Sequence, residues 1–523
     1  MARGLPAMVY SDGIGKRVQV KFGGYNHNAY AGEGEIWDME NMGSDLYPIL
    51  APRRERRHIA TYEGKANGYY RRDGLSLRAD GEKLFKNDEE LSAVTDTRKQ
   101  FIPMGTYVII LPDKLCYNTK TEEIKPMEAE WTGSAKIQDG TFAGEDAKAN
   151  TIYAEGADWG AKFQAGDAVT IEGCEKHKEN NTSIIIREID GDYLRFYENS
   201  FILSDGGDEE GNLTIKRSVP DMDFMCENEN RLWGCRGDTI YASKLGDPFN
   251  WNVFDGISTD SFAVDVGSAG DFTGCFAFLG YPCFFKEEHI YKVYGDRPAN
   301  FQVMGSASLG VTKGSGQSMA RAGEVLFYLS RIGICAYTGG MPQSVATPFG
   351  EVKYKNAVAG SDGVKYYVSM EDGGGTHHLF VYDTQKNLWH REDNTAAISF
   401  AWDEGRLYCQ TEKDLWYYGE DGDEEIESFA EFGDFTDGDP NKKGTSKLQL
   451  RLELDEGAEL AVKMQFDSEK VWHEVKTLST TAKRSFYLPI VPRRADHFRL
   501  RLEGKGRWRL YSMTRESYSG SEF

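Results

Sequence analysis

A short β-hairpin pattern recurs along this chain, and its spacing restricts the possible folds more than any other feature. Residues 229–254, ENRLWGCRGDTIYASKLGDPFNWNVF, show it: an apolar-aromatic strand, a polar turn at Arg236-Gly237-Asp238, and a second strand. First strands of the same kind begin near residues 68, 105, 230, 280, 323, 363 and 404. Five of the six steps are near 40 residues, the length of one four-stranded propeller blade.

The repeat predicts an all-β chain with a propeller of about seven blades. A lone four-stranded sheet leaves its aromatic faces uncovered, whereas stacked blades cover each other. The side chains expected to be buried between blades are those of Trp233, Phe285, Phe327, Tyr367 and Tyr408. A pair of β-sandwiches that use similar hairpins is the alternative fold. No WD, kelch or Asp-box motif recurs, so no motif identifies the family of the blades.

The one long step between hairpins predicts an insertion. It places blades 1–2 in residues 56–126, an inserted domain in residues 127–218 and blades 3–7 in residues 219–435. Short alternating strands joined by Gly and Asp turns, above all in residues 163–201, indicate a small five-stranded β-barrel. Its basic residues 176–178 lie between glutamates, so we expect contact with protein; nucleic-acid binding is the alternative.

The two ends of the chain follow other patterns. Residues 1–55 scatter aromatic residues among Gly and polar residues without a period, which predicts an extended N-terminal arm packed on the propeller or on a neighbouring subunit. The rings of Tyr25, Tyr30, Trp37 and Tyr47 are expected to be buried by this packing. Residues 436–523 alternate apolar and polar side chains, which predicts a C-terminal β-sandwich. The side chains expected on its buried face include those of Leu448, Leu450, Leu452 and Leu454.

Composition limits the partners of the chain. Its 523 residues carry a net charge of −22, which disfavours a protein that grips DNA by its phosphates but suits one that lets DNA slide past. The basic clusters Arg53-Arg54-Glu55-Arg56-Arg57 and Arg493-Arg494 are expected to face protein partners, because Arg pairs with carboxylates. No apolar stretch reaches the length of a membrane span, so we expect a soluble protein made in a cytoplasm. The eight cysteines form no zinc-type spacing, and we expect small buried thiols.

No catalytic, cofactor-binding or metal site is predicted. His377 and His378 are adjacent and are placed on a hairpin turn. The acidic stretches 205–212 and 421–427 lack the calcium-loop spacing, so they are interpreted as acidic turns. Residues 310–316, GVTKGSG, do not match a P-loop. Paired carboxylates of a propeller glycosidase remain an open enzyme alternative, since such residues are distant in sequence.

Three segments carry a resemblance to a known group of proteins. The first is FGGYN…GEGEIWDMENM…YPILAPRR in residues 22–54, the second is NRLWGC…TIYASKLGDPFNWNVF in residues 230–254, and the third is HFRLRLEGKGRWRLYSMTRE in residues 497–516. These strings resemble the tail hub proteins of short-tailed phages, also called stabilisation or tail accessory proteins, whose relatives form tail nozzles. The inserted barrel is not part of this resemblance.

The resemblance implies a structural virion protein of the tail, not an enzyme, without cofactor. It implies a ring of identical subunits, which we expect to be a hexamer, around the DNA channel. Expected partners are the portal or adaptor, tail fibres or tailspikes, and duplex DNA passing without sequence-specific binding. Such a protein is made in the host bacterial cytoplasm and ends in the virion. A receptor-facing tail-tip or baseplate protein and a propeller glycoside hydrolase are the alternatives.

Overall fold

A computed structural model describes residues 15–144, 146–203, 209–419, 422, 424–438, 441–491 and 493–519, and these are almost entirely β-strand. The described helices are single 3₁₀ turns: η1 (Trp159–Ala161), η2 (Lys178–Asn180), η3 (Pro298–Asn300), η4 (Gly316–Ser318) and η5 (Thr347–Phe349). The chain divides into two compact units, one of residues 1–66, 71–75 and 317–523 and the other of residues 67–70 and 76–316.

Four four-stranded antiparallel sheets lie in or mainly in the second unit, each joining consecutive strands in chain order. The first contains β6 (Ala66–Arg72), β7 (Leu75–Asp80), β8 (Lys83–Lys86) and β9 (Glu89–Ala93). The second contains β10 (Gln100–Met104), β11 (Tyr107–Leu111), β12 (Leu115–Asn118) and β13 (Ile124–Pro126). The third contains β21 (Phe224–Asn228), β22 (Arg231–Arg236), β23 (Thr239–Ala242) and β24 (Phe262–Asp265). The fourth contains β25 (Gly274–Phe278), β26 (Tyr281–Phe285), β27 (His289–Tyr294) and β28 (Gln302–Ala307).

Three further sheets of the same kind lie in the first unit. The fifth contains β29 (Ala320–Ala322), β30 (Val325–Ser330), β31 (Gly333–Tyr337) and β32 (Gln343–Ser344). The sixth contains β33 (Lys355–Ser361), β34 (Lys365–Glu371), β35 (His377–Asp383) and β36 (Leu388–Arg391). The seventh contains β37 (Ser399–Asp403), β38 (Arg406–Gln410) and β39 (Asp414–Tyr418), and its fourth strand is β5 (Arg56–Thr61) from the other end of the chain.

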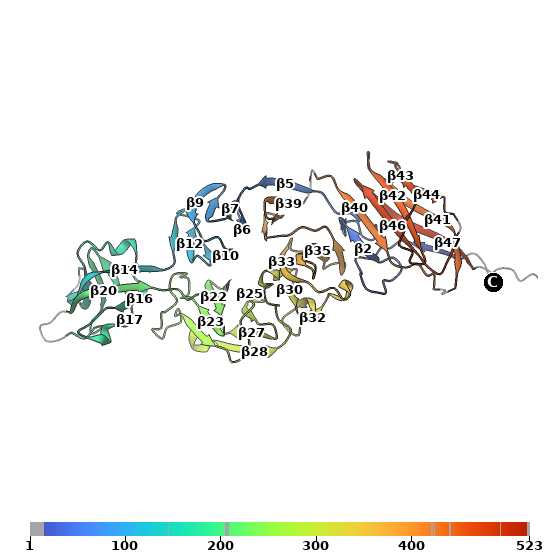
Figure 1. Cartoon of the computed structure of the whole chain (residues 1–523). Helices are drawn as coiled ribbons and strands as arrows, with labels where there is room; N and C mark the ends of the chain where they lie inside the picture. Colours follow the sequence, from blue (N-terminus) through green and yellow to red (C-terminus); the bar gives the residue numbers. More distant parts are fainter. Residues whose placement is uncertain are drawn as a thin grey trace, which may run out of the picture. The chain divides into compact units, whose positions relative to one another are not determined.

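The predicted fold class is confirmed: the chain is all-β and built of propeller blades (Figure 1). The five aromatic side chains expected to be buried are at most 8% exposed. Trp233 meets Phe284 of the next sheet at a ring-centroid distance of 6.5 Å, and Phe327 meets Tyr366 of its next sheet at 5.1 Å. In the opening hairpin, Trp251 is also buried, whereas Tyr241 is half-buried.

The insertion follows the second sheet and precedes the third, and it is larger than expected. It is one seven-stranded antiparallel sheet in the order β17-β16-β20-β14-β15-β19-β18. Its strands are β14 (Ala129–Thr141), β15 (Lys148–Tyr153), β16 (Ala168–Glu172), β17 (Ser183–Ile185), β18 (Glu188–Asp190), β19 (Tyr193–Tyr197) and β20 (Glu209–Arg217). Five strands were expected because β14 is half-exposed and neither β14 nor the short β15 contains a long apolar run. Trp159 and Phe196 are fully buried in a core of its own.

The predicted sandwich consists of two five-stranded sheets. One contains β1 (Gly15–Gln19), β41 (Lys443–Leu454), β44 (Arg484–Leu488), β45 (Arg494–Ala495) and β47 (Trp508–Ser519). The other contains β2 (Ile36–Glu40), β40 (Glu427–Phe432), β42 (Glu459–Phe466), β43 (His473–Leu478) and β46 (Phe498–Lys505). The four leucines expected on the buried face of β41 are at most 1% exposed, as predicted.

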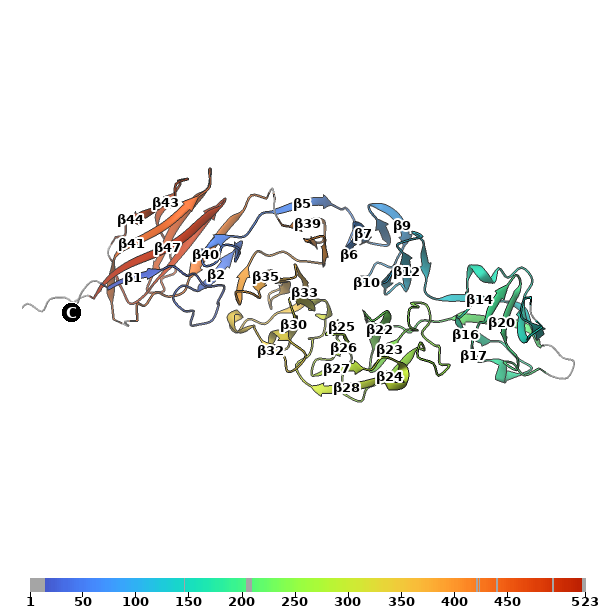
Figure 2. The same ribbon diagram turned by 180° about the vertical axis from the view of Figure 1, so that it is seen from behind.

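The N-terminal segment differs from the extended arm expected of it, because two of its pieces are strands of this sandwich. Strand β1 pairs with β47 and strand β2 with β40, and Figure 2 shows both N-terminal strands, in blue, among those of the sandwich. A small hairpin, β3 (Met42–Gly43) and β4 (Ala51–Pro52), follows. Of the four aromatic rings expected to be buried in this segment, Tyr25 is buried, Trp37 and Tyr47 are half-buried, and Tyr30 is 87% exposed. Residues 1–14 of the predicted arm lie outside the described residues.

The cysteines agree with the sequence-based expectation: all eight are free thiols and all are buried. Within the described part of the chain, no helix has the length and apolar character of a bilayer span.

Candidate functional site

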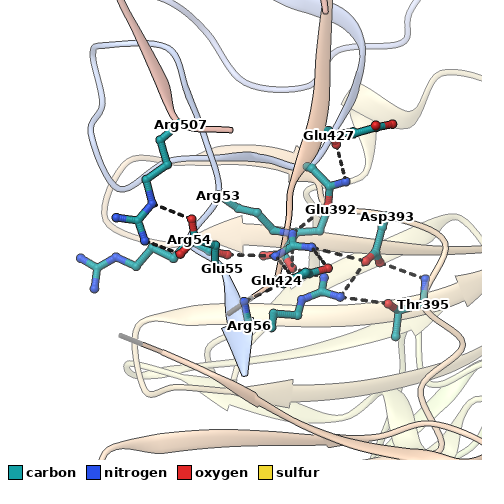
Figure 3. Close-up of polar contacts among 11 residues, drawn as sticks. Arg53, Arg54, Glu55, Arg56, Glu392, Asp393, Thr395, Glu424, Glu427 and Arg507 are labelled. Atoms are coloured by element: carbon teal, nitrogen blue, oxygen red, sulfur yellow. Dashed lines mark hydrogen bonds and ion pairs between the residues drawn. The ribbon is translucent and has the colours of Figure 1, made fainter. Parts of the chain in front are cut away.

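A buried cluster of charged side chains forms where three segments of the first unit meet (Figure 3). The N-terminal segment contributes Arg53, which directly follows β4, and Arg56, the first residue of β5. Glu392 and Asp393 come directly after β36, and Glu424 belongs to the connection between β39 and the sandwich strand β40. The cluster therefore joins the N-terminal segment, the sixth sheet and the entry to the sandwich.

The Arg53 side chain is only 4% exposed and binds Glu424 in a two-pronged pair. Its Nη1 and Nη2 each donate to one Glu424 carboxylate oxygen at 2.9 Å. Its Nε donates to Asn41 Oδ1 at 2.8 Å, and Asn41 Nδ2 donates to the backbone carbonyl of Glu427 at 2.8 Å. This planar, fixed geometry is characteristic of Arg–carboxylate recognition and is not available to Lys.

Arg56 carries the second half of the cluster. Its Nη2 donates to Glu392 Oε2 at 2.6 Å, and its Nη1 donates to Asp393 Oδ2 at 2.6 Å and Thr395 Oγ1 at 3.2 Å. Its guanidinium lies 4.4 Å from the centre of the Tyr418 ring, which adds a cation–π contact. The backbone N–H of Arg56 donates to Glu424 at 3.3 Å, so that carboxylate bridges both arginines.

The neighbouring arginines keep Asp393 ionised. Burial opposes the charge on Asp393, but the charge and hydrogen bond of Arg56 outweigh it and lower the pKa of Asp393 to about 2. A buried pair of this kind holds the chain in one arrangement, because loss of either partner would leave a charge without compensation.

This arrangement corrects one expectation. The run Arg53-Arg54-Glu55-Arg56-Arg57 was expected to face protein partners, yet Arg53 and Arg56 are buried internal ties. Glu55 pairs with Arg507 of the sandwich through Oε1 at 2.8 Å. Arg54 and Arg57 are exposed.

A cavity of about 550 Å³ adjoins the cluster within the first unit. Its walls come from the N-terminal segment, the sixth sheet and the seventh sheet. Its charged lining consists of five basic residues, Arg53, Arg54, Arg56, Lys365 and Arg406, and five acidic residues, Asp45, Glu55, Asp362, Glu392 and Glu404. Its aromatic lining consists of Tyr367, Trp402, Tyr417 and Tyr418.

The charges of this cavity compensate each other. Lys365 Nζ lies 2.6 Å from Asp45, which Arg54 also approaches at 3.4 Å. Burial and the nearby cation of Lys365 lower the pKa of His390 to about 4, so this imidazole is neutral at pH 7. The cavity thus offers fixed hydrogen-bonding groups with balanced charge.

The carboxylates of the cavity are held as acceptors. Asp362 accepts hydrogen bonds from the backbone N–H groups of Val364 and Lys365 at 2.9 and 2.6 Å. Burial disfavours the charge on Asp45, but its cationic partners lower its pKa. Glycoside cleavage needs a protonated carboxyl group of raised pKa as the general acid, and the lowered pKa of Asp45 is the opposite of what that role requires.

The remaining sequence candidates do not gather at this cavity. His377 and His378 begin strand β35 instead of lying on the turn, and His378 Nε2 lies 2.9 Å from Asp372 Oδ2. The Gly310 backbone packs against Lys286, which gives GVTKGSG a structural role. Parts of the acidic turns, residues 205–208, 421 and 423, lie outside the described residues. Among the described residues, Asp467, Asp496 and His497 gather ligand atoms at metal-site spacing on the sandwich.

Sequence reasoning missed Glu392, Asp393, Glu424 and Trp402. Their partners lie far away along the chain, more than 330 residues for the pairs of Arg56, so a local motif does not reveal them. Trp402 lies in β37, just before the seventh predicted hairpin, and it is 44% exposed at the cavity.

Comparison with known proteins gives no family for this chain. No family model and no curated protein matches it. Among solved structures, U3-55K aligns over 69% of this chain and 98% of its own at 5% identity and a TM-score of 0.32. PorZ of Porphyromonas gingivalis, a surface component of the type-IX secretion system, covers 88% and 78% at 10% identity and a TM-score of 0.27. The endosialidase of phage phi92 covers 76% and 74% at 9% identity and a TM-score of 0.24. Likenesses this low carry no argument about function.

Proposed function

We propose that this chain is a structural virion protein of a phage tail, a hub or nozzle subunit that forms a ring around the DNA channel. One observation carries the proposal: the N-terminal residues that resemble phage tail hub proteins are here structural joints. Ile36, Met39 and Met42 of IWDMENM are fully buried. Arg53 of APRR holds the entry to the sandwich through Glu424.

Glycine positions in the same stretch support this role. A Cβ on Gly24 would lie 2.4 Å from the carbonyl oxygen of Trp389, and one on Gly43 would lie 2.9 Å from Arg53 Cα. The segment therefore packs its backbone closely against the sixth sheet and the arginine cluster. The N-terminal segment thus serves to join parts of the fold, and this structural use fits a scaffold subunit better than an enzyme.

Localisation in particles tests the proposal. A phage genome that encodes this chain with a small epitope tag should give particles that carry the tag at the head–tail junction, seen by cryo-electron microscopy. The purified subunit, alone or with its portal or adaptor, should assemble to about six times 58.8 kDa by mass photometry. A tag at the distal tip would favour the receptor-facing alternative, and particles that lack the chain would contradict a virion role.

A second candidate function rests on the cavity, and we propose it as saccharide recognition by a receptor-facing module. An anionic ligand gains little from a cavity in which Arg53, Arg56 and Lys365 are already paired with carboxylates. A neutral polyol instead uses fixed donors and acceptors and stacks on an exposed aromatic face, as Trp402 provides.

Saturation-transfer NMR with a panel of neutral mono- and disaccharides tests this candidate. We expect transfer signals that disappear in Trp402→Ala and persist in Tyr30→Ala, which removes an exposed ring outside the cavity lining. Signals that survive Trp402→Ala, or a wild-type chain that gives none, would contradict saccharide binding. Release of reducing sugar during the same incubation would favour the glycosidase alternative.

A further inference from the structure

Two buried thiols face each other across neighbouring sheets of the second unit. Cys226 lies in β21, the first strand of the third sheet, and Cys275 lies in β25, the first strand of the fourth sheet. Their sulfur atoms are 2.9 Å apart, and they are 49 residues apart in sequence. The two side chains are 8% and 6% exposed.

The surroundings of this pair are apolar. Cys226 lies opposite Trp233 in the strand register, and Cys275 lies opposite Phe284. Both thiols belong to the same core cluster as these rings and Tyr291. Besides the other thiol, Cys275 Sγ approaches the backbone carbonyl oxygen of Trp233 at 3.9 Å. The side chains of this cluster are apolar and offer neither sulfur atom a strong hydrogen-bonding partner.

We propose that Cys226 and Cys275 form a disulfide that links the third and fourth sheets when the protein meets a hydroperoxide. A disulfide needs sulfur atoms about 2.05 Å apart, so closing this pair requires a movement of roughly 0.9 Å. The chemistry is balanced in two steps. One thiolate attacks the peroxide oxygen and gives a sulfenic acid and hydroxide, and the second thiol then displaces water from the sulfenic sulfur.

The burial of the two thiols determines the rate at which they are oxidised. Burial raises the pKa of the Cys275 thiol, and only the thiolate is the effective nucleophile. Oxidation should therefore be slow in the folded protein and should accelerate as pH rises. A reducing cytoplasm keeps the thiols free, and an oxidising exterior favours the link. This inference is independent of the proposed tail role.

Peptide mapping of the full-length protein tests the link directly. The wild-type chain is incubated with hydrogen peroxide, its remaining thiols are alkylated under denaturing conditions, and the digest is analysed without reduction. We expect one new linked peptide joining Cys226 to Cys275, two hydrogens lighter than the sum of its parts and lost on reduction. The oxidised protein should melt roughly 4–10 °C higher than the reduced form.

Cysteine variants complete the test. Cys226→Ser should remove both the linked peptide and the rise in Tm, whereas Cys116→Ser, which removes a buried thiol of the second sheet, should keep both. The mapping needs only the wild-type chain, so a poorly folding variant does not block it. Both thiols remaining open to alkylation, a link to Cys235 or Cys283 instead, or a lower Tm after oxidation would each overturn the proposal.

Discussion

Arg56 has three polar side-chain partners and one aromatic ring around a guanidinium that is almost entirely buried. Arg56→Ala removes the charge that compensates Glu392 and Asp393, so we expect a loss of about 3–5 kcal/mol in the free energy of unfolding of the first unit. Chemical denaturation followed by tryptophan fluorescence measures it.

The neighbouring Arg57 provides the matched control. It is exposed, and Arg57→Ala should change the free energy of unfolding by no more than about 0.5 kcal/mol. Equal effects of the two substitutions would show that the cluster does not hold the junction.

His390 gives the first unit a specific sensitivity to acid. Its pKa is lowered to about 4 in the fold and returns to about 6.5 on unfolding, so the unfolded chain takes up the proton first. The stability linked to the neutral imidazole is intact above pH 6.5 and is lost as pH falls toward 4. We expect a loss of about 3 kcal/mol across this range, measured by denaturant unfolding at a series of pH values.

His390→Gln should flatten the stability profile between pH 6.5 and 4. His473→Gln, which changes a half-exposed histidine of the sandwich, should leave the slope in place. The pKa of Asp393 is lowered from 3.8 to about 2, so its contribution to stability is lost mainly below pH 3.8, at the acid end of this range. An unchanged slope in His390→Gln would rule out this histidine as the source.

At the scale of single residues, the sequence predicts some of the buried side chains but not all of them. Trp233 and Phe285 could be predicted as buried because blade neighbours are close in sequence and share a repeating pattern. The burial of Arg53 and Arg56 could not be predicted. A run of basic residues has the same sequence whether its carboxylate partners belong to another protein or to distant parts of its own chain.

At the scale of elements, strand β2 decides whether the sandwich is complete. Ile36 is fully buried, and it pairs in register with Phe432 of β40. Ile36→Ala should cost about 2–5 kcal/mol through lost burial and a cavity. Hydrogen exchange of the amides in β40 and β46 should accelerate, which localises the effect to the sandwich.

Val18→Ala in β1 provides the control, since Val18 is 56% exposed and its truncation leaves no cavity. If Ile36→Ala left hydrogen exchange in β40 unchanged, β2 would not be an integral strand of the sandwich, and the N-terminal segment would instead be a detachable arm.

The two kinds of sheet differ in how far sequence could predict them. Apart from β5 in the seventh sheet, the blade sheets join consecutive strands, so their hairpins are visible locally. Strands β2 and β40 pair across almost 400 residues, and a β-bulge between Ile36 and Asp38 interrupts the alternation of β2. Neither the partner nor the period was therefore visible in the sequence, whereas the regular alternation in β41 showed the sandwich itself.

At the scale of the whole molecule, the net charge of −22 bears on the proposed passage of DNA. Many of its cations are already paired with carboxylates, as Arg53, Arg56 and Arg493 are. Pairing leaves fewer cations to release counterions from phosphates, which is the main source of nonspecific affinity for DNA. A ring that binds duplex weakly would let it move through quickly.

We therefore expect no detectable binding of the purified protein to a short fluorescent duplex at about 150 mM salt, where screening acts beyond roughly 8 Å. Fluorescence anisotropy measures it, and a second titration at low salt separates screening from a true lack of affinity. The variant Lys176→Gln/Lys178→Gln neutralises the basic cluster of the insertion and is compared with the wild-type protein in the same assay. Tight binding that falls steeply with added salt would contradict free passage, and its loss in this variant would identify the insertion as the nucleic-acid-binding element.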